Sequence, residues 1–467
     1  MISFVLNEQD ISTDLSPGLT LLDFVRYHRR LMGTKCGCRE GDCGACTVLV
    51  GELSGNNVRY HSMTSCLTPL SNIAGKHVVT VEGINSGEGR LTAVQEALVT
   101  ESGTQCGFCT VGFVMSLTGF CLEEEPLTSE GAIAAIDGNI CRCTGYKSIE
   151  RAAERLSVLS KSQKDETPLL SAIENNVVPV YFKDIPSRLA KIPIRPTAEN
   201  KVQLPAETVF VGGGTDLFVQ RPEKMEHIPA VYLFDDISLK SIRQNGDRID
   251  IGANVTVTEL MASDLLQSLF PRLKSFLKLV SSTPVRNMAT VAGNLVNASP
   301  IGDLTVWLLA LDAVVVLQGQ NTREVPLKDF YTGYKKMDRQ PGEIVTSIYF
   351  RRPSGQYYFN FEKVSKRTYL DIASVNTAIL LRLDGHIIVE AHLSAGGVGP
   401  VPLYLRQTAA FLTGKSIHQP GELMAQANEI MGTEISPISD IRGSATYKKL
   451  LLRQLLYAHF VEMFSLT

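Results

Sequence analysis

The sequence predicts a multidomain α+β protein whose N-terminal third differs chemically from the rest. Its 467 residues are enough for about three domains. Hydrophobic residues at 44% and charged residues at 20% are ordinary for a globular protein. All ten cysteines lie between Cys36 and Cys143. Along the chain the pattern changes from short strands to helices, and later to alternating strands and helices. These changes favour four domains over three.

Charge and composition exclude several classes of protein. With 45 basic and 48 acidic residues, the net charge of −3 provides no basic field for nucleic acid. The longest largely apolar stretch, Leu304 to Leu317, is too short to cross a bilayer and contains Asp312. The opening residues, MISFVLNEQD, lack the basic start and apolar run of a secretory signal. We therefore expect a cytoplasmic protein, without a membrane partner, whose clustered cysteines bind metal rather than form disulfides.

The N-terminal part has the pattern of a small sheet around one helix. ISFVLN, DISTDL, TVLV and VRYHSM are strand-like, and TLLDFVRYHRRL has helical spacing. From about residue 91 to residue 160 four helical stretches follow. The next segment begins with the polar run KSQKDETP, which is typical of a linker.

The rest of the chain alternates strands and helices. TVFVGGG, AVYLFDD, RIDIGANV and AVVVLQG are strand-like, and LMASDLLQSLFPRLKSFLKLV is helical with a break at Pro271. A further α+β segment starts near Gln356 and ends in two helices. The predicted parts are residues 1–80, 81–160, a linker at 161–174, 175–352 and 356–467.

The first set of candidate metal ligands lies in GCREGDCGAC, with one cysteine further along. Its members are Cys38, Cys43, Cys46 and Cys66. The C-x4-C-x2-C spacing is that of plant-type [2Fe–2S] sites, and the glycines between the cysteines let the backbone bend around two irons. Structural zinc prefers two separate cysteine pairs, so zinc is the weaker alternative here. Cys36 fits no position of the pattern and is expected to pack.

The second set consists of two close pairs in QCGFC and CRC. Its members are Cys106, Cys109, Cys141 and Cys143. Alone, this arrangement also suits tetrahedral zinc. Beside a ferredoxin-type loop, a second [2Fe–2S] cluster is favoured. Cys121, on the apolar face of its helix, is expected in the core.

Two small-residue loops are candidates for binding a nucleotide. FVGGGTDL runs from a strand into consecutive glycines, whose N–H groups can form a nest for pyrophosphate, and Thr215 adds a hydroxyl. This segment is not the Gly-x-Gly-x-x-Gly fingerprint, so a Rossmann fold is not predicted, and a plain structural turn stays open. TVAGN and ASPIGD form the second loop, which offers a carboxylate for a hydroxyl or an adenine amine.

These motifs resemble the xanthine dehydrogenase and molybdenum hydroxylase family. GCREGDCGACTV, QCGFCTVGF and DGNICRCTGY resemble its β-grasp, plant-type ferredoxin-like domain and its four-helix [2Fe–2S] domain. FVGGGTDL and VRNMATVAGNLVNASPIGD resemble its α+β FAD-binding domain, of the vanillyl-alcohol-oxidase (PCMH-like) type. The residues from Gln356 resemble the α+β domain that follows. Val111 stands where the family usually has proline, which should only soften a turn.

The resemblance also implies which residues contact FAD. It places Asp303 near the adenosine or ribityl part, Val345 against the flavin and Lys363 near the isoalloxazine. Without the family, a core valine and a solvated surface lysine are the alternatives at the last two positions. The implied FAD-binding residues are Phe210, Val211, Gly212, Gly213, Gly214, Thr215, Asp216, Leu217, Thr290, Val291, Ala292, Gly293, Asn294, Asp303, Val345 and Lys363.

The function implied is that of an iron–sulfur and FAD electron-transfer subunit. The molybdopterin would lie on a large partner subunit, in a heterotetramer with two copies of each chain. Electrons would pass through the helical-domain cluster and the ferredoxin-like cluster to FAD and then NAD+, during hydroxylation of hypoxanthine to xanthine and urate. Gln105 would face the pterin, and no catalytic residue is predicted in this chain. Aldehyde, nicotinate or aromatic acyl-CoA conversion stay open, as does a non-enzymatic zinc-binding scaffold.

Overall fold

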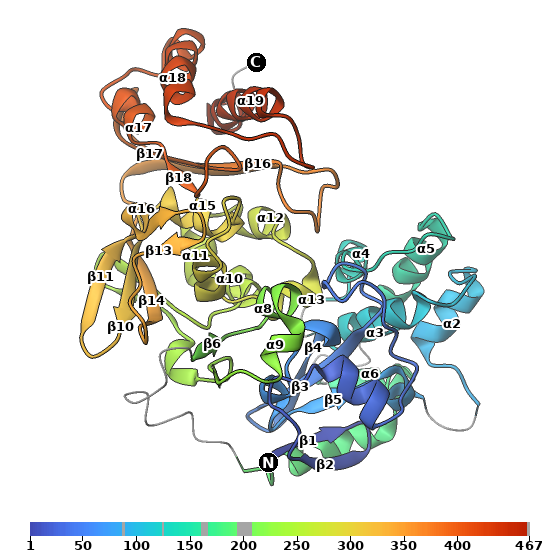
Figure 1. Cartoon of the computed structure of the whole chain (residues 1–467). Helices are drawn as coiled ribbons and strands as arrows, with labels where there is room; N and C mark the ends of the chain where they lie inside the picture. The colour runs from blue at the N-terminus through green and yellow to red at the C-terminus, as the bar shows by residue number, and fades with distance from the viewer. Residues whose placement is uncertain (86–88, 124–125, 160–166, 194–207, 465–467) are drawn as a thin grey trace. The chain divides into compact units, whose positions relative to one another are not determined.

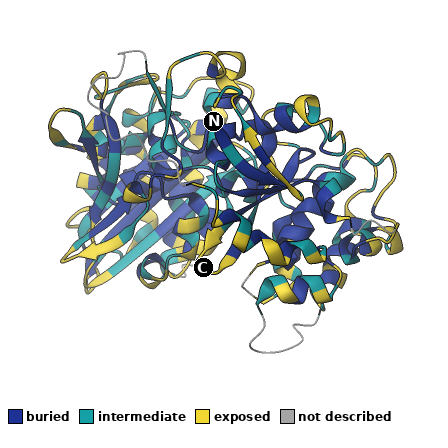
Figure 2. Ribbon diagram, turned by 90° about the horizontal axis from the view of Figure 1, so that it is seen from below, coloured by how far each residue is buried: buried dark blue, intermediate teal, exposed yellow. Residues whose placement is uncertain are grey.

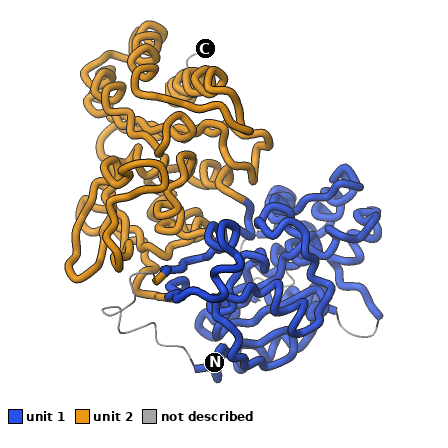
Figure 3. The backbone as a smooth tube through the Cα atoms, viewed as in Figure 1, with its two compact units in different colours: residues 1–199, 209–235, 282–288 blue, residues 200–208, 236–281, 289–467 orange. Residues whose placement is uncertain are grey.

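The structure is a computed structural model that describes residues 1–85, 89–123, 126–159, 167–193 and 208–464 (Figure 1). It confirms the predicted multidomain α+β class. The chain divides into two compact units, drawn in blue and orange in Figure 3. Unit 1 contains the described residues up to 193 together with 209–235 and 282–288. Unit 2 contains residues 236–281 and the described residues from 289 onward.

The N-terminal sheet of unit 1 has the mixed strand order β2-β1-β5-β3-β4. β1 is antiparallel to β2 and parallel to β5, while β3 is antiparallel to β4 and β5. The strands are β1 (Ile2–Leu6), β2 (Gln9–Thr13), β3 (Thr47–Ser54), β4 (Asn57–Thr64) and β5 (His77–Val79). Between β2 and β3, α1 (Leu21–Asp23) begins at the capping residue Thr20 and continues into the π-helical turn Phe24–His28. The predicted strand–helix–strand order is confirmed.

Both faces of this sheet are buried, because its strands alternate apolar residues on each side. Phe4 and Val48 face the core around the π-helical turn. Val5 and Leu49 face the opposite core, which the helical domain shares. Buried residues follow the strands in Figure 2.

The helical domain packs on that second face. Its helices are α2 (Ala93–Thr100), α3 (Thr110–Cys121), α4 (Ser129–Ala135) and α5 (Lys147–Leu156). α3 is buried from Gly112 to Cys121 and contacts β3, so it is the central element. Thr92 and Gln95 form a capping box that begins α2.

The segment after this domain differs from the prediction. Residues 161–166 of the predicted linker lie outside the described residues, but its end forms helix α6 (Pro168–Glu174). A 3-10 turn, Val180–Asp184, and helix α7 (Ile185–Leu189) follow. Phe182 is fully buried in the same core as the helical domain. A side chain of this kind contributes about 1.5–3 kcal/mol on burial. Residues 175–189, which the predicted boundary assigns to the next domain, therefore pack in the same core as the helical domain.

A second part of the predicted FAD domain also lies in unit 1. β6 (Val209–Val211) pairs in parallel with β7 (Ala230–Tyr232). The short helices here are α8 (Leu217–Gln220), α9 (Pro222–Met225) and α13 (Thr283–Arg286). Val211 and Phe218 belong to the core that contains Phe4. Lys76, almost fully buried, pairs with Glu52 at 2.6 Å and Asp235 at 2.7 Å.

Unit 2 contains a sheet with the order β11-β10-β14-β9-β8. Its strands are β8 (Ile242–Asn245), β9 (Arg248–Gly252), β10 (Val314–Gln318), β11 (Thr322–Pro326) and β14 (Ile344–Arg351), and β12 (Tyr331–Gly333) and β13 (Lys336–Met337) form a separate hairpin. Its helices are α10 (Val257–Ala262), α11 (Asp264–Leu269), α12 (Leu273–Lys278), α14 (Val291–Val296), α15 (Asp303–Leu309) and α16 (Leu327–Phe330). The predicted break at Pro271 is confirmed, since α11 ends before it and α12 begins after it.

The C-terminal part of unit 2 is a sheet with the order β15-β16-β17-β18, followed by helices (Figure 1). The elements are β15 (Gln356–Val364), β16 (Val375–Asp384), β17 (Ile387–Gly396), β18 (Leu403–Tyr404), α17 (Arg406–Leu412), α18 (Pro420–Glu434) and α19 (Ala445–Phe464). Ile379 and Phe460 are fully buried between sheet and helices. In the part of the chain that the structure describes, no helix has the length and apolarity to span a membrane.

Candidate functional site

The first four candidate ligands form two pairs of thiols in unit 1. The thiol of Cys43 hydrogen-bonds to Cys38, which lowers the pKa of Cys38 to about 5 and raises the pKa of Cys43. The thiol of Cys66 bonds in the same way to Cys46, so the pKa of Cys46 falls and that of Cys66 rises, with burial adding to the rise. The loop also directs amides at sulfur, since Glu40 N–H lies 3.3 Å from Cys38 Sγ.

Glycine is needed where this loop passes its own sulfur atoms. A Cβ on Gly37 would lie 2.6 Å from Cys43 Sγ. Gly41 and Gly44 have φ of +78° and +66°, which an L side chain rarely adopts. The predicted bending of the backbone at these glycines is therefore present.

The second four candidate ligands also form two pairs. Cys143 Sγ lies 3.6 Å from Cys106 Sγ, and both residues are exposed. Cys109 and Cys141 share the other thiol–thiol bond, and burial together with that bond raises the pKa of Cys109 to about 12. The helical domain thus brings together cysteines that lie 30 residues or more apart in sequence.

The pairing suits a cluster of two irons. In a [2Fe–2S] cluster with four cysteine ligands, each iron takes two thiolates, so two thiol pairs are the donor set required. Among the described residues, no three cysteine, histidine, aspartate or glutamate side chains are arranged to hold a single metal ion. Cys121 is buried in the core as predicted, and burial raises its pKa to about 12. Cys36 is half-buried beside the first loop.

Two groups of residues beside the cysteines were not predicted. Thr144 Oγ1 donates to Cys141 Sγ at 3.2 Å and accepts from Tyr146 N–H at 3.3 Å. Arg39, with φ of +58°, forms two bonds to the Asp23 carboxylate at 2.9 and 2.6 Å. The sequence signal for the first group is CTGY, which begins at the last cysteine, Cys143. No local pattern links Arg39 to Asp23.

The first glycine-rich loop lies in unit 1, directly after β6. Gly214 has φ of +86°, and the carbonyl of Gly212 accepts from Asn72 Nδ2 at 2.9 Å. Within the described ranges, the N–H groups of Gly213, Gly214 and Thr215 donate to no other residue. Three consecutive backbone donors of this kind are what an anion-binding nest requires.

The second loop lies in unit 2, and the backbone N–H groups of residues 291–294 already have acceptors. Val291 N–H bonds to Val255 O at 2.9 Å, and Ala292 N–H to Ala253 O at 3.0 Å. Gly293 N–H bonds to the Thr290 hydroxyl, which caps α14. Asn294 Oδ1 accepts from Thr305. Residues 291–294 therefore offer a surface of small residues rather than a set of phosphate donors.

Asp303 and Lys363, both in unit 2, are directly paired. Lys363 Nζ lies 2.7 Å from Asp303 Oδ2 and 2.6 Å from Leu279 O, with its side chain 1% exposed. Asn376 Nδ2 donates to the other Asp303 oxygen at 2.6 Å. The alternative of a solvated surface lysine is wrong. Val345 is buried in β14 opposite Leu317, as a core valine would be.

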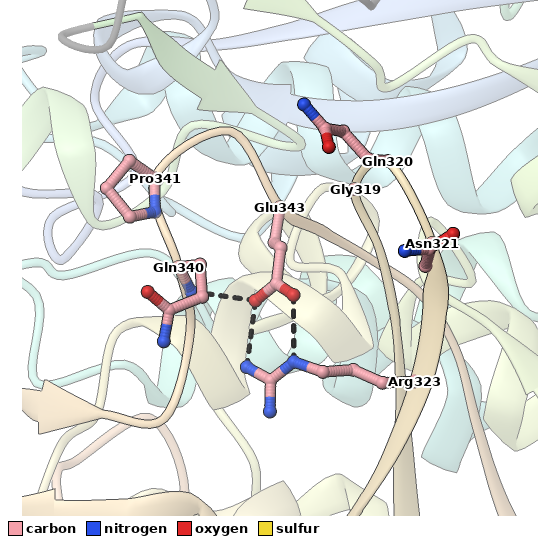
Figure 4. Close-up of a pocket in the computed structure, with 7 residues that line it drawn as sticks. All are labelled: Gly319, Gln320, Asn321, Arg323, Gln340, Pro341 and Glu343. Carbon is pink, nitrogen blue, oxygen red and sulfur yellow. Dashed lines mark hydrogen bonds and ion pairs between the residues drawn. The ribbon is translucent and has the colours of Figure 1, made fainter.

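A polar pocket of unit 2 lies apart from these residues in the sequence. It has a volume of about 560 Å³ and is lined by Gly319, Gln320, Asn321, Arg323, Gln340, Pro341 and Glu343 (Figure 4). Arg323 forms two bonds of 2.8 Å to Glu343, so its charged groups neutralise one another. The pocket contains no predicted site residue.

Four family models match consecutive parts of the chain. They are described as a 2Fe-2S iron-sulfur cluster binding domain at residues 4–71, a [2Fe-2S] binding domain at 80–154, an FAD binding domain in molybdopterin dehydrogenase at 198–352, and a CO dehydrogenase flavoprotein C-terminal domain at 360–463. The chain belongs to the molybdenum hydroxylase family. It holds the family's [2Fe–2S]-binding and FAD-binding domains, and both cysteine sets lie in the iron–sulfur segments.

Individual relatives agree with this assignment. Xanthine dehydrogenase of Emericella nidulans is 30% identical over 531 residues, which cover 99% of this chain and 39% of that protein. Aldehyde oxidase 1 of Rattus norvegicus is 26% identical and covers the same shares. The chain thus spans about 39% of the length of these molybdenum hydroxylases. Among solved structures, reconstituted CO dehydrogenase from Oligotropha carboxidovorans is 27% identical, with a TM-score of 0.52 over 55% of this chain and 89% of that one.

Proposed function

We propose that the chain transfers electrons from a molybdopterin-binding large subunit to NAD+, in a xanthine dehydrogenase-type enzyme that converts hypoxanthine to xanthine and urate. The two subunits would assemble with two copies of each. The observation that most strongly supports this proposal is the arrangement of the eight candidate ligand thiols in four pairs. Similarity to xanthine dehydrogenases over nearly the whole chain supports the choice of purine substrates. Free thiols at all ten cysteines suit a reducing compartment, which supports a cytoplasmic location.

Each thiol pair would hold one iron. The pairs are Cys38 with Cys43, Cys46 with Cys66, Cys106 with Cys143, and Cys109 with Cys141. When bound, the clusters carry single electrons and FAD exchanges electron pairs with NAD+. Cys106 and Cys143 are exposed, so a cluster that they hold would lie at the protein surface, which suits the entry of electrons from a partner.

The residues proposed to bind FAD are of two kinds: backbone N–H donors for the pyrophosphate, and a carboxylate with the side chains that orient it. The amides of Gly213, Gly214 and Thr215 would bind the pyrophosphate, because those donors have no other described acceptor. Asp303 is held in one orientation by Lys363 and Asn376 and retains lone pairs for a ligand hydroxyl. The residues from Thr290 to Asn294 would contribute close packing around FAD.

Cofactor analysis of the purified chain tests the assignment. We expect four irons and one FAD per chain, with the visible absorption of [2Fe–2S] clusters. Replacement of Cys109 by Ser should remove one cluster, because a serine oxygen is a poor ligand for this soft site. Cys121→Ser is the matched control and should keep four irons. Two irons, or stoichiometric zinc, in the unmodified chain would contradict the proposal. Stoichiometric zinc would instead support the alternative of a non-enzymatic zinc-binding scaffold.

The acceptor and the substrate need separate experiments. The chain alone should oxidise NADH with an artificial dye, and Cys106→Ser should keep that activity because the dye accepts electrons from the flavin. With the partner present, the same variant should lose xanthine-dependent NAD+ reduction. The likeness to aldehyde oxidase 1 makes aldehyde conversion the second candidate. Turnover of an aldehyde without turnover of xanthine would select it.

A further inference from the structure

A buried asparagine contacts the glycine nest from a part of unit 1 that lies outside the FAD-binding match. Asn72 belongs to the 3-10 turn Leu70–Ile73, whereas the match covers residues 198–352. Its Nδ2 donates to the carbonyl of Gly212, directly before the nest donors that begin at Gly213, at 2.9 Å. A side chain from the N-terminal part of the chain thus holds the loop proposed to bind the pyrophosphate.

The other polar atom of this side chain has no hydrogen-bond partner. Asn72 is 3% exposed, and within the described residues nothing donates to its Oδ1. A buried acceptor is normally paired, because burial without a donor costs free energy. Oδ1 and Nδ2 are bonded to the same carbon, so the unpaired acceptor lies beside the loop that Nδ2 contacts. This arrangement indicates that the missing donor belongs to a ligand of the loop.

The position of Asn72 is fixed by the packing of its turn. Leu70 is fully buried, and its N–H donates to Leu19 O at 2.9 Å. The nest packs against the same part of the chain, since a Cβ on Gly214 would lie 3.1 Å from Leu67 O. Turn and nest are therefore held together, and the unpaired oxygen keeps one place relative to the nest donors.

The chemistry of FAD limits which of its groups can donate to this oxygen. The phosphate oxygens are acceptors and cannot pair with Oδ1. The hydroxyls of the ribityl chain and of the adenosine ribose flank the pyrophosphate on its two sides, and each hydroxyl donates one hydrogen bond. A neutral amide oxygen accepts such a bond, whereas a carboxylate in the same place would repel the phosphates.

We propose that Asn72 binds FAD directly, its Oδ1 accepting a hydrogen bond from a hydroxyl that flanks the pyrophosphate. Its Nδ2 at the same time fixes the carbonyl of Gly212 and with it the start of the nest. The inference rests on the proposed function, in which the nest binds FAD. It adds a ligand contact from the turn Leu70–Ile73 to those implied by the two small-residue loops.

The test is a double-mutant cycle between Asn72→Leu and analogues of FAD that each lack one ribityl or ribose hydroxyl. Leucine has nearly the same size and removes both polar atoms. Ser71→Ala, in the same turn, is the matched control. Gly421→Ala, a helical glycine of α18 with open space around its Cβ position, is a second control. Each chain is freed of flavin and titrated with FAD and with every analogue, followed by flavin fluorescence, and its irons are counted.

We expect one analogue to bind the unmodified chain about tenfold more weakly than FAD, the loss that follows when one buried acceptor is left unpaired. Asn72→Leu should keep four irons, bind FAD about tenfold more weakly, and no longer distinguish that analogue from FAD. Both controls should bind FAD like the unmodified chain. If Asn72→Leu loses iron, Asn72→Ala, which adds no new atoms, takes its place in the cycle.

Two results would overturn the inference and leave the proposed function standing. One is equal binding of FAD and all analogues by the unmodified chain, which needs no variant. The other is a variant at Asn72 that discriminates among the analogues as the unmodified chain does, because its side chain would then only support the loop. An unmodified chain that holds four irons and binds no FAD would instead overturn the proposed function.

Discussion

Replacement of Thr144 by valine should lower the reduction potential of the second cluster. The Thr144 hydroxyl donates to Cys141 Sγ at 3.2 Å and is itself oriented by Tyr146 N–H. A donor to sulfur stabilises the reduced cluster more than the oxidised one, because reduction adds negative charge to the sulfurs. Valine has nearly the same shape and lacks the donor.

The magnitude follows from the strength of such a bond. A hydrogen bond to a charged group is worth about 1.5–3 kcal/mol. If about half of that strength depends on the added electron, the loss is about 0.8–1.5 kcal/mol. Near the upper end, about 1.4 kcal/mol is a tenfold change in the equilibrium constant for reduction. For a one-electron couple this is about 60 mV.

The assay is a redox titration followed by electron paramagnetic resonance, with Thr144→Ser as the matched control. Serine keeps the hydroxyl, so its potential should stay close to that of the unmodified protein. The first cluster, whose ligands Thr144 does not contact in the described residues, serves as an internal reference. An unchanged potential of the second cluster in Thr144→Val, with full iron content, would refute the role assigned to this hydrogen bond.

Three further predictions concern the glycine nest, a buried ion pair and a buried histidine. Gly214 has φ of +86°, so Gly214→Val should reduce the flavin absorbance per chain while four irons remain, and Gly421→Ala should not. Arg286 and Asp137 pair at 2.7 Å with both side chains 5% exposed, so Arg286→Met should lower the free energy of unfolding by about 3–5 kcal/mol in chemical denaturation. Burial lowers the pKa of His459 to about 3 from its ordinary 6.5. Between these values the unfolded chain binds a proton that the folded one excludes, so stability should fall as pH falls, by about 1.4 kcal/mol per unit. His459→Gln should flatten that dependence in thermal unfolding at pH 7 and pH 5.

Much of the fold followed from local patterns. Strand alternation located β1 to β4, and the break at Pro271 separated α11 from α12. Residues 175–189 and 209–235 have ordinary element patterns, and nothing in those patterns says which core they join. Phe182 and Phe218 pack with the iron–sulfur domains because both faces of the N-terminal sheet are apolar and need cover.

The sequence by itself determined the two cysteine sets, the glycines that bend the first loop and the strand that leads into the glycine nest. Within each short motif, covalent spacing places such groups a few residues apart, whatever the rest of the chain does. Only the tertiary structure decided which thiols pair, that Asn72 reaches Gly212, and that Lys363 is buried against Asp303. These contacts join residues 5 to 140 positions apart, and each depends on how the helices and sheets pack around buried polar groups. Spacing along the chain brings candidate ligands close in sequence. The packing of helices and sheets sets the distances between these side chains in space.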